Sequence, residues 1–258
     1  MAKGTEIFTK IPKTEYTEEL LPVNADNFHH VILNRRSVRV YEETPIPEDV
    51  VHKVLEHTLL APNSSNLQPW EFYWVKSPEN KKLLVEACFS QPAARTAPVL
   101  VVAVARPDLW KKHATQMIEF FDSSKFHVPA SARAYYEKLA PMMYTQGPLN
   151  IIGWLKKISM FFAGFFKVVP RGPNSHHDME VWANKTVALG CENFMLSMSA
   201  HGYDTCPMEG FDEVRVKKLL KLPRRARVTM VMSAGKRAKV GVYGPRVRFP
   251  KEQFIKIL

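Results

Sequence analysis

The chain has 258 residues, of which 46% are hydrophobic and 24% charged, as in ordinary soluble globular proteins. Its formal net charge of +11 implies a negatively charged partner, namely nucleic acid, an anionic membrane surface or a phosphorylated ligand. Nucleic-acid binding is disfavoured because the sequence has no long basic tail and no helix-turn-helix, zinc-finger or RNA-binding signature. The three cysteines are widely spaced without a CxxC pair, so they indicate neither a disulfide framework nor a zinc site.

The organisation that we expect is one domain with an arm and an insertion. Residues 1–26 carry little periodic signal and predict an N-terminal arm, and residues 27–258 predict a single domain without repeats or linkers. Within it, residues 107–177 are expected to form a helical insertion. The N-terminus has no apolar stretch of signal-peptide length, so the sequence predicts a cytoplasmic protein.

A cluster of arginines follows the first predicted helix. Asp26 is expected to cap a short helix over residues 27–33. In the extended segment that follows, Arg35, Ser37 and Arg39 would share one face. Such a segment predicts a clamp for phosphate, because guanidinium groups bind phosphate through two parallel hydrogen bonds. A solvated basic turn is the alternative.

Helix and strand signals then alternate. A proline and two acidic residues over 47–49 begin a helix that stops at Ala61-Pro62, and a second helix is expected over 77–89. An aromatic strand is predicted over 72–75, and an apolar strand, buried on both faces, over 97–105.

The loop over residues 61–70 is dense in small polar side chains. It contains three side-chain amides and two hydroxyls, on Asn63, Asn66, Gln68, Ser64 and Ser65. Such residues are common turn formers, but they also offer many donors and acceptors for a polyol or a heterocycle.

The predicted insertion contains an unusual helix. Over residues 151–166, two isoleucines, a tryptophan, a leucine and four phenylalanines fall on one side of a helical projection, with lysines and small residues on the other. Lysines interrupt it too often for it to span a bilayer. Three interpretations remain open: a lid over a pocket or a partner subunit, a core helix, and a helix on a membrane surface.

The last third of the chain begins with a long, largely apolar helix over 178–201. The helical periodicity is interrupted over 205–211, where we expect an irregular segment. An amphipathic helix is expected over 211–222 and a strand over 228–233. Two alternating arginines, Arg246 and Arg248, come next, and the tail over 254–258 is expected to add an edge strand.

Familiar catalytic motifs are absent from the sequence. It has no GxGxxG after a first strand, no P-loop, no HExxH and no GxSxG. The histidine pairs at 29–30 and 176–177 lack a third metal ligand at a suitable spacing, and we interpret both as surface pairs. A cofactor that brings its own chemistry is therefore the economical hypothesis.

Four segments together resemble the flavin-dependent nitroreductases. They are Arg35-Arg36-Ser37-Val38-Arg39, the Ala-Pro-x-Ser-x-Asn-x-Gln-Pro-Trp loop at 61–70, Pro207-Met208-Glu209-Gly210-Phe211, and Arg246-x-Arg248-x-Pro250. Each segment alone is a weak signal, but all four occur in the family's order and at similar separations, over residues of about 27–258.

The resemblance implies an α+β fold with a mixed, mainly antiparallel central sheet flanked by helices. It also implies a homodimer with FMN at the interface, NADH or NADPH as the electron donor, and a small electron-poor aromatic acceptor. In this family, insertions such as 107–177 tend to cover the flavin and select the substrate.

The resemblance also implies roles for individual residues. The FMN phosphate would be held by Arg35, Arg246 and Arg248, assisted by Arg36 and Ser37. Arg39 would reach the pyrimidine side of the flavin ring, and a backbone N–H near Glu209 and Gly210 would point at the flavin N5 after the turn at Pro207 and Met208. The ribityl chain and ring edge of an FMN shared with the other subunit would bind Ser64, Asn66 and Gln68. Gln91 would lie near the flavin of the partner site.

Several functions share this fold and cofactor. The sequence favours an NAD(P)H oxidoreductase that reduces nitroaromatic or quinone-like acceptors by a ping-pong mechanism. Reductive dehalogenation and flavin turnover remain alternatives, because relatives of the family perform both. A further alternative, from a different functional class, is a basic protein that docks on a membrane or nucleic acid. Its contacts would be made by Lys156, Lys157, Lys167, Arg224 and Arg225.

Overall fold

The computed structural model of the chain describes residues 16–258. Its centre is a four-stranded sheet with the order β1-β2-β4-β3, in which every neighbouring pair is antiparallel. The strands are β1 (Trp70–Trp74), β2 (Val99–Ala105), β3 (Asp204–Met208) and β4 (Arg227–Gly235). A single parallel bridge joins Ser37 to Thr205 at the start of β3. The α+β fold with a mainly antiparallel sheet is therefore confirmed.

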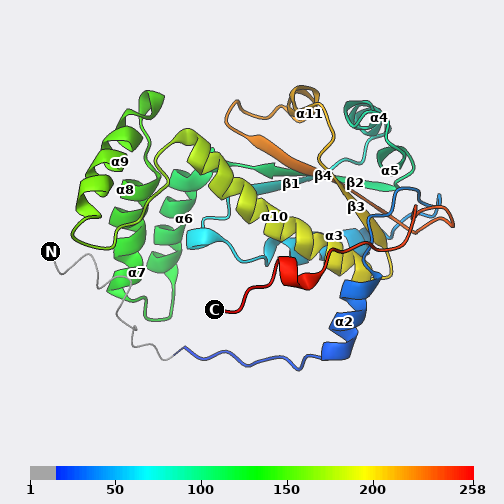
Figure 1. Cartoon of the computed structure of the whole chain (residues 1–258), viewed down its shortest axis with the longest axis horizontal. Helices are drawn as coiled ribbons and strands as arrows, with labels where there is room; N and C mark the ends of the chain where they lie inside the picture. The colour runs from blue at the N-terminus through cyan, green and yellow to red at the C-terminus, as the bar shows by residue number, and fades with distance from the viewer. Residues whose placement is uncertain (1–15) are drawn as a thin grey trace.

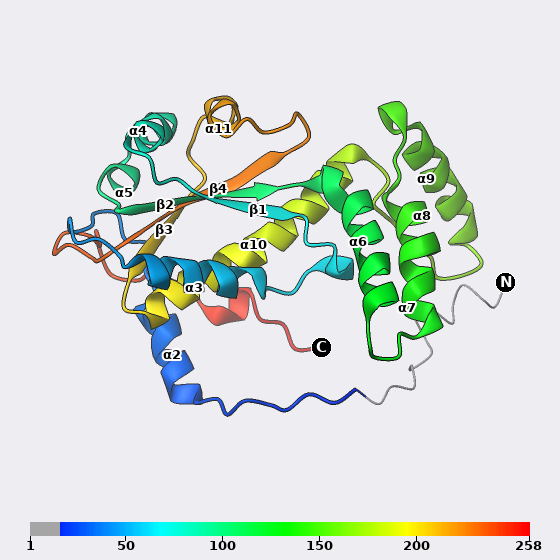
Figure 2. The same ribbon diagram turned by 180° about the vertical axis from the view of Figure 1, so that it is seen from behind.

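Helices cover both faces of the sheet and form a lobe at one end (Figures 1 and 2). One face carries α3 (Glu48–Leu59) and the long helix α10 (His176–Ala200), and the other carries α4 (Pro78–Ala87), α5 (Pro92–Arg95) and α11 (Glu213–Leu219). The lobe consists of α6 (Trp110–Ser123), α7 (Ala130–Ala134), α8 (Ala140–Tyr144) and α9 (Ile151–Ala163), and α2 (Ala25–Asn34) lies toward the opposite end.

Two hydrophobic cores follow from this layering. Strand β2 is buried along its whole length, so its side chains contribute alternately to the two cores. One core packs the sheet against α3 and α10 around Phe194 and Val54, and the other packs it against α4 and α11 around Leu84 and Val216. The lobe joins the first core through the buried side chains of Tyr136, Ala140 and Tyr144.

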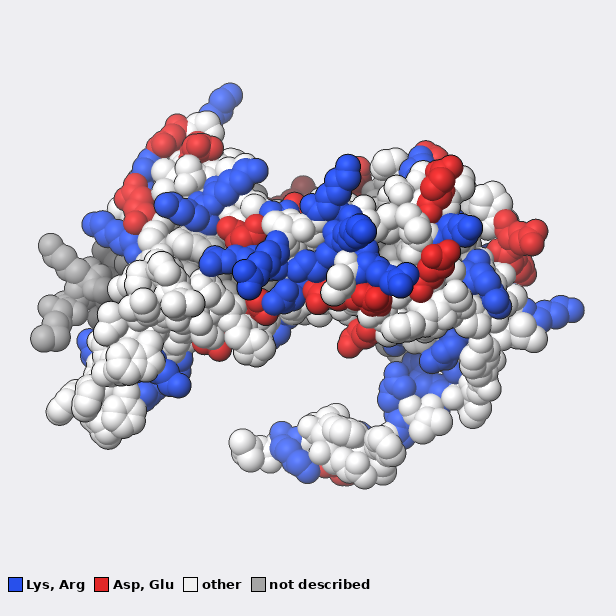
Figure 3. All heavy atoms as spheres, turned by 90° about the horizontal axis from the view of Figure 1, so that it is seen from above, with Lys and Arg blue, Asp and Glu red and all other residues white. Residues whose placement is uncertain are grey.

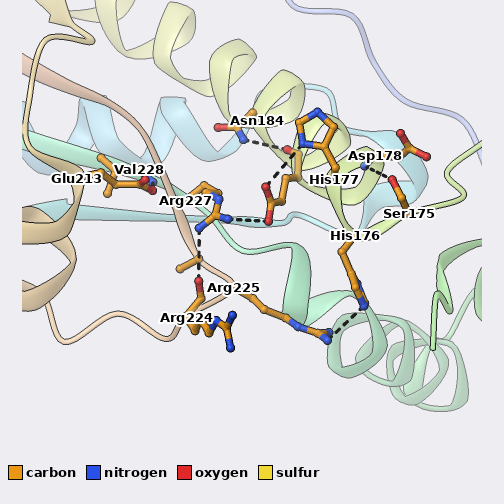
Figure 4. A network of polar contacts seen from close by, with 12 residues as sticks. Ser175, His176, His177, Asp178, Asn184, Glu213, Arg224, Arg225, Arg227 and Val228 are labelled. Atoms are coloured by element: carbon orange, nitrogen blue, oxygen red, sulfur yellow. Dashed lines mark hydrogen bonds and ion pairs between the residues drawn. The ribbon is translucent and has the colours of Figure 1, made fainter. Parts of the chain in front are cut away.

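A polar network ties the start of α10 to β4 (Figure 4). The Arg227 guanidinium lies 2.9 Å from a carboxylate oxygen of Glu180, and the Thr229 hydroxyl donates to the Asn184 side chain at 2.8 Å. The Arg225 guanidinium lies 3.4 Å from Nε2 of His176, the first residue of the helix. These contacts fix where the long helix crosses the sheet.

Several sequence expectations need correction. The Asn24 side chain, rather than Asp26, caps α2 by accepting from the Asn27 N–H at 2.9 Å, so the helix begins at Ala25. Strand β3 occupies part of the segment that we expected to be irregular, and Pro207 pairs with Met232 inside it. A proline is tolerated there because β3 is an edge strand in the described sheet.

At the C-terminus, the structure forms a short 3₁₀ helix over Lys251–Gln253 and no strand over 254–258. At the N-terminus, residues 16–24 have no regular secondary structure, and the rest of the predicted arm lies outside the described residues. The predicted boundary between arm and domain stays a prediction.

The interpretation of residues 151–166 as a core helix is wrong. Of the residues in α9, only Gly153 is buried, and the isoleucine, tryptophan and phenylalanine side chains are exposed. Within the described residues, no helix is long and apolar enough to cross a membrane.

Candidate functional site

The two arginine segments meet at one open pocket of about 210 Å³. One wall comes from the extended segment after α2, with Arg35, Arg36, Ser37 and Arg39, and the other from residues 242–248, which include Arg246 and Arg248. These segments are far apart in the sequence, so the pocket exists only in the folded chain. The predicted clamp residues at both places are thus brought together.

Backbone carbonyls hold the two walls together. An amino group of Arg246 donates to the carbonyl oxygens of Leu33 and Arg35 at 2.7 and 2.6 Å, and Arg36 donates to that of Gly244 at 2.6 Å. The Leu33 carbonyl belongs to the last turn of α2, so Arg246 also caps that helix. These bonds use one amino group of each guanidinium and leave the others available to a ligand.

The pocket is electrostatically unbalanced. Among the described residues, no carboxylate forms an ion pair with any of its five arginines. Removal from water lowers the pKa of Arg246, and a smaller lowering comes from the positive charges on Arg36, Arg248 and Arg35. Crowded guanidinium groups without a counter-charge form a site for a compact multivalent anion, and a phosphate group has the matching geometry. This arrangement favours the clamp over a solvated turn.

Arg39 lies at the edge of this pocket, where the pocket adjoins β3. Its backbone N–H donates to the Gly241 carbonyl at 2.8 Å, and its guanidinium lies 5.4 Å from the centre of the Tyr243 ring. The same positive charge opposes the increase in the pKa of Cys206 that burial causes. Arg39 thus places a fixed positive charge beside the edge strand.

The far end of β3 presents a free backbone donor. The Gln91 side chain donates to the Gly210 carbonyl at 2.7 Å, which orients the peptide that follows the strand. Within the described chain, no hydrogen bond uses the N–H of Glu209 or Gly210. Pro207 and Met208 lie in β3, and Met208 is buried in the core, so these two residues position the turn.

The amide loop adopts a strained backbone. Ser65, Asn66 and Gln68 all have positive φ angles, of 61°, 45° and 44°, in the left-handed region that non-glycine residues seldom occupy. Internal bonds help to hold this shape, since the Asn63 side-chain oxygen accepts from the Gln68 N–H at 2.9 Å.

Tyrosines from the lobe clamp the loop from outside. The Ser65 hydroxyl contacts the hydroxyls of Tyr135 and Tyr144, the latter at 2.9 Å, and the Tyr136 hydroxyl donates to the Ser65 carbonyl at 2.9 Å. The loop therefore depends on the predicted insertion for its conformation. Asn66 and Gln68 point into a second open pocket of about 360 Å³, which they share with His113, Gln116, Met117 and Phe120 of α6.

The predicted site residues thus form three groups within one chain. The arginines and Ser37 form the first, and Gln91 with residues 207–210 forms the second, at the two ends of β3. Asn66 and Gln68 form the third on another pocket, with Ser64 in the same turn but not lining that pocket.

Sequence reasoning missed several residues at these places. They include Tyr243 over Arg39, Thr205 with a buried hydroxyl that has no partner, and the three tyrosines that clamp Ser65. None carries a local signal, because each is defined by a contact across the fold.

The pocket at α10 and the histidine pair there are weaker candidates for a functional site than the three groups above. A third pocket of about 180 Å³ lies at the start of α10 between Trp110, His176 and Arg225. The His176 ring nitrogen contacts the Gly147 carbonyl at 3.1 Å, so this histidine has structural partners, whereas the His177 side chain is largely exposed. Among the described residues, no three histidine, cysteine or acidic side chains are grouped to hold a metal.

Comparisons with known proteins agree with this geometry. Residues 32–236 match the nitroreductase family. A Thermus thermophilus protein named NADH dehydrogenase is 28% identical over 223 residues, which cover 86% of this chain and 92% of that protein.

Among solved structures, the nitroreductase ydfN from Bacillus subtilis has a TM-score of 0.71 at 21% identity, covering 91% of this chain and all of that one. A nitroreductase from Exiguobacterium sibiricum, solved in complex with FMN, has a TM-score of 0.61 at 23% identity, covering 95% of this chain and all of that one. The family match spans most of the chain, and the fold, the arginine pocket and the free donor after β3 accord with it: the chain belongs to the nitroreductase family.

Proposed function

We propose that this chain is an FMN-dependent enzyme that passes electrons from NADH or NADPH to an electron-poor aromatic acceptor, either a nitroaromatic compound or a quinone. The observation that carries the proposal is the arginine pocket, in which guanidinium groups from two distant segments converge without a carboxylate. The phosphate of FMN is a compact dianion, so it fits the charge and the hydrogen-bonding geometry of the pocket.

The phosphate end would be held by Arg35, Arg246 and Arg248, with Arg36 and Ser37 assisting. Arg246 is suited to this role because its bonds to Leu33 and Arg35 fix its guanidinium in place before a ligand arrives. A donor that is already ordered loses little conformational entropy on binding.

The ring end would lie along β3. Arg39 would place its positive charge near the pyrimidine side of the flavin, where it stabilises the negative charge of the reduced ring. The free N–H of Gly210 or Glu209 would donate to the ring edge, and the bond from Gln91 to the Gly210 carbonyl keeps that peptide oriented. A glycine suits this position because it permits close approach.

The third group of residues supports a homodimer. Asn66 and Gln68 lie on a pocket of their own, and with Ser64 they would bond the ribityl chain and ring edge of the FMN shared with the other subunit. The C-terminal segment also exposes large apolar side chains, including Phe249, Phe254 and Ile255, which a second subunit would cover.

When bound, FMN supplies hydride-transfer chemistry. The protein contributes binding, orientation and exclusion of water, and no general base is required. Because the nicotinamide and the acceptor would use the same exposed site in turn, we expect ping-pong kinetics.

The test is an absorption spectrum of the purified protein under anaerobic conditions, before and after addition of NADH or NADPH. We expect flavin absorption that bleaches with at least one nucleotide and returns when a quinone or nitroaromatic compound is added. A flavin that stays oxidised with both nucleotides would overturn the proposed donor. A colourless protein that FMN does not reconstitute would overturn the cofactor assignment.

A further inference from the structure

The helix α9 is attached to the protein by the side that would normally face water. Gly153 is buried so closely that a Cβ atom there would lie 1.9 Å from the Asn174 carbonyl oxygen. The Lys156 ammonium points inward and donates to the carbonyls of Met143 and Pro173 at 2.7 and 3.3 Å. Small and polar residues therefore hold the helix in place, which turns its apolar side outward.

The outward side is a broad apolar surface, which we call the α9 face. It is formed by Trp154, Leu155, Ile158, Phe161, Phe162 and Phe165, which are between 37% and 69% exposed. Phe166, in the turn after the helix, is 90% exposed. With about 100 Å² exposed for each large side chain, the face amounts to roughly 700 Å², more than the largest apolar patch of a typical monomer. No segment of the described chain covers it.

The charges within the segment that carries the α9 face all have one sign. Residues 138–177 contain five lysines and arginines and no aspartate or glutamate. Lys157 and Lys167 are exposed, and Arg171 lies against Gly164 at the end of the helix. In Figures 1 and 2 the helix is the outermost element of the lobe, and Figure 3 shows an uncharged surface at this end of the molecule, with basic side chains beside it and acidic side chains farther away, toward the opposite edge of the view.

We propose that the α9 face docks the protein on the surface of an anionic lipid bilayer. Aromatic and aliphatic side chains of an interfacial helix enter the boundary between headgroups and acyl chains, while lysines at its margin pair with acidic lipids. A second copy of the chain that paired through this face would bring the exposed Lys157 and Lys167 of the two copies together without acidic residues between them. The bilayer offers the opposite charge and an apolar layer together.

The experiment measures binding to vesicles of equal parts phosphatidylglycerol and phosphatidylcholine by co-sedimentation. Two double variants test the face: Phe161→Ser with Phe165→Ser removes apolar area, and Lys157→Glu with Lys167→Glu reverses the charge. Their controls lie elsewhere on the surface: Val214→Ser with Val240→Ser removes exposed apolar side chains outside the face, and Lys82→Glu with Lys239→Glu reverses the same number of charges.

We expect the unaltered protein to bind, and both α9 variants to bind at least about tenfold more weakly, while the controls stay within about twofold. Binding should also weaken with added salt and on vesicles of phosphatidylcholine alone. Flavin absorption and far-ultraviolet circular dichroism should be the same in all five proteins, because the altered side chains are exposed.

Two results would overturn the proposal. The first is that the unaltered protein does not bind the vesicles; if the Phe161→Ser, Phe165→Ser variant then also dissociates in sedimentation velocity, the face belongs to a second subunit. The second is an equal loss of vesicle binding in the controls, which would mean that the effect is not specific to the α9 face. Failure of FMN binding is a separate outcome, since it leaves the vesicle results unchanged.

Discussion

The arginine pocket and the α9 face are both basic regions without acidic partners, but they are built in opposite ways. In the pocket, guanidinium groups converge from two segments and are fixed by backbone carbonyls. On α9, the one lysine that is fixed by carbonyls points inward, and the remaining cations border an apolar surface. Convergent cations select a compact anion, whereas cations spread around an apolar area suit an extended anionic surface.

The largest effect that would test this contrast is expected in the pocket. In the variant with Arg246→Met and Arg248→Met, two charge-assisted contacts to the FMN phosphate are lost, each worth about 1.5–3 kcal/mol. We therefore expect FMN affinity to fall by about 3–6 kcal/mol in fluorescence titration. Arg95→Met serves as the control, since Arg95 is exposed and lies outside the pocket.

The loss of the α2 cap in this variant needs a separate measurement. The circular dichroism spectrum should show an intact fold. Loss of the α2 cap should lower the free energy of unfolding by no more than about 1 kcal/mol. Unchanged FMN affinity in the folded variant would mean that the phosphate binds elsewhere.

The next effect concerns how α9 is attached. Gly153→Ala places a methyl group against the Asn174 carbonyl and the Gln146 side chain, so we expect the free energy of unfolding to fall by about 3 kcal/mol. Alanine has the higher helix propensity, by about 1 kcal/mol, so an isolated helix would instead be stabilised. Urea unfolding distinguishes the two, and Ser159→Ala on the exposed side of α9 is the control. A more stable Gly153→Ala protein would show that α9 is not packed in this way.

The smallest expected effect is a difference in stability between substitutions of two adjacent lysines. Lys156→Met leaves the Met143 and Pro173 carbonyls without this donor, which should cost about 1–2 kcal/mol of stability. Lys157→Met removes an exposed charge, and we expect a change within about 0.5 kcal/mol. Thermal unfolding of both variants measures the difference. Equal effects at the two positions would contradict the inward orientation of Lys156.

Local sequence patterns predicted much of the secondary structure. The Pro47-Glu48-Asp49 start, the Ser77-Pro78-Glu79 start and the apolar run of β2 all correspond to observed elements. They are predictable because helix caps and hydrophobic periodicity act over a few residues. Strand β3 was missed because Pro207 weakens the local strand signal, and only pairing with β4 compensates.

The sequence by itself determined which residues could bind a phosphate, because the alternation of arginines at 35–39 and 246–248 is a local property of the sequence. Only the tertiary structure decided that Arg246 reaches Arg35, 211 residues away, and that three tyrosines hold Ser65. It also decided the direction of α9. Helical periodicity shows that a helix has two unlike sides, but which side faces the protein depends on the surface it meets, here the backbone around Asn174 that admits only a glycine.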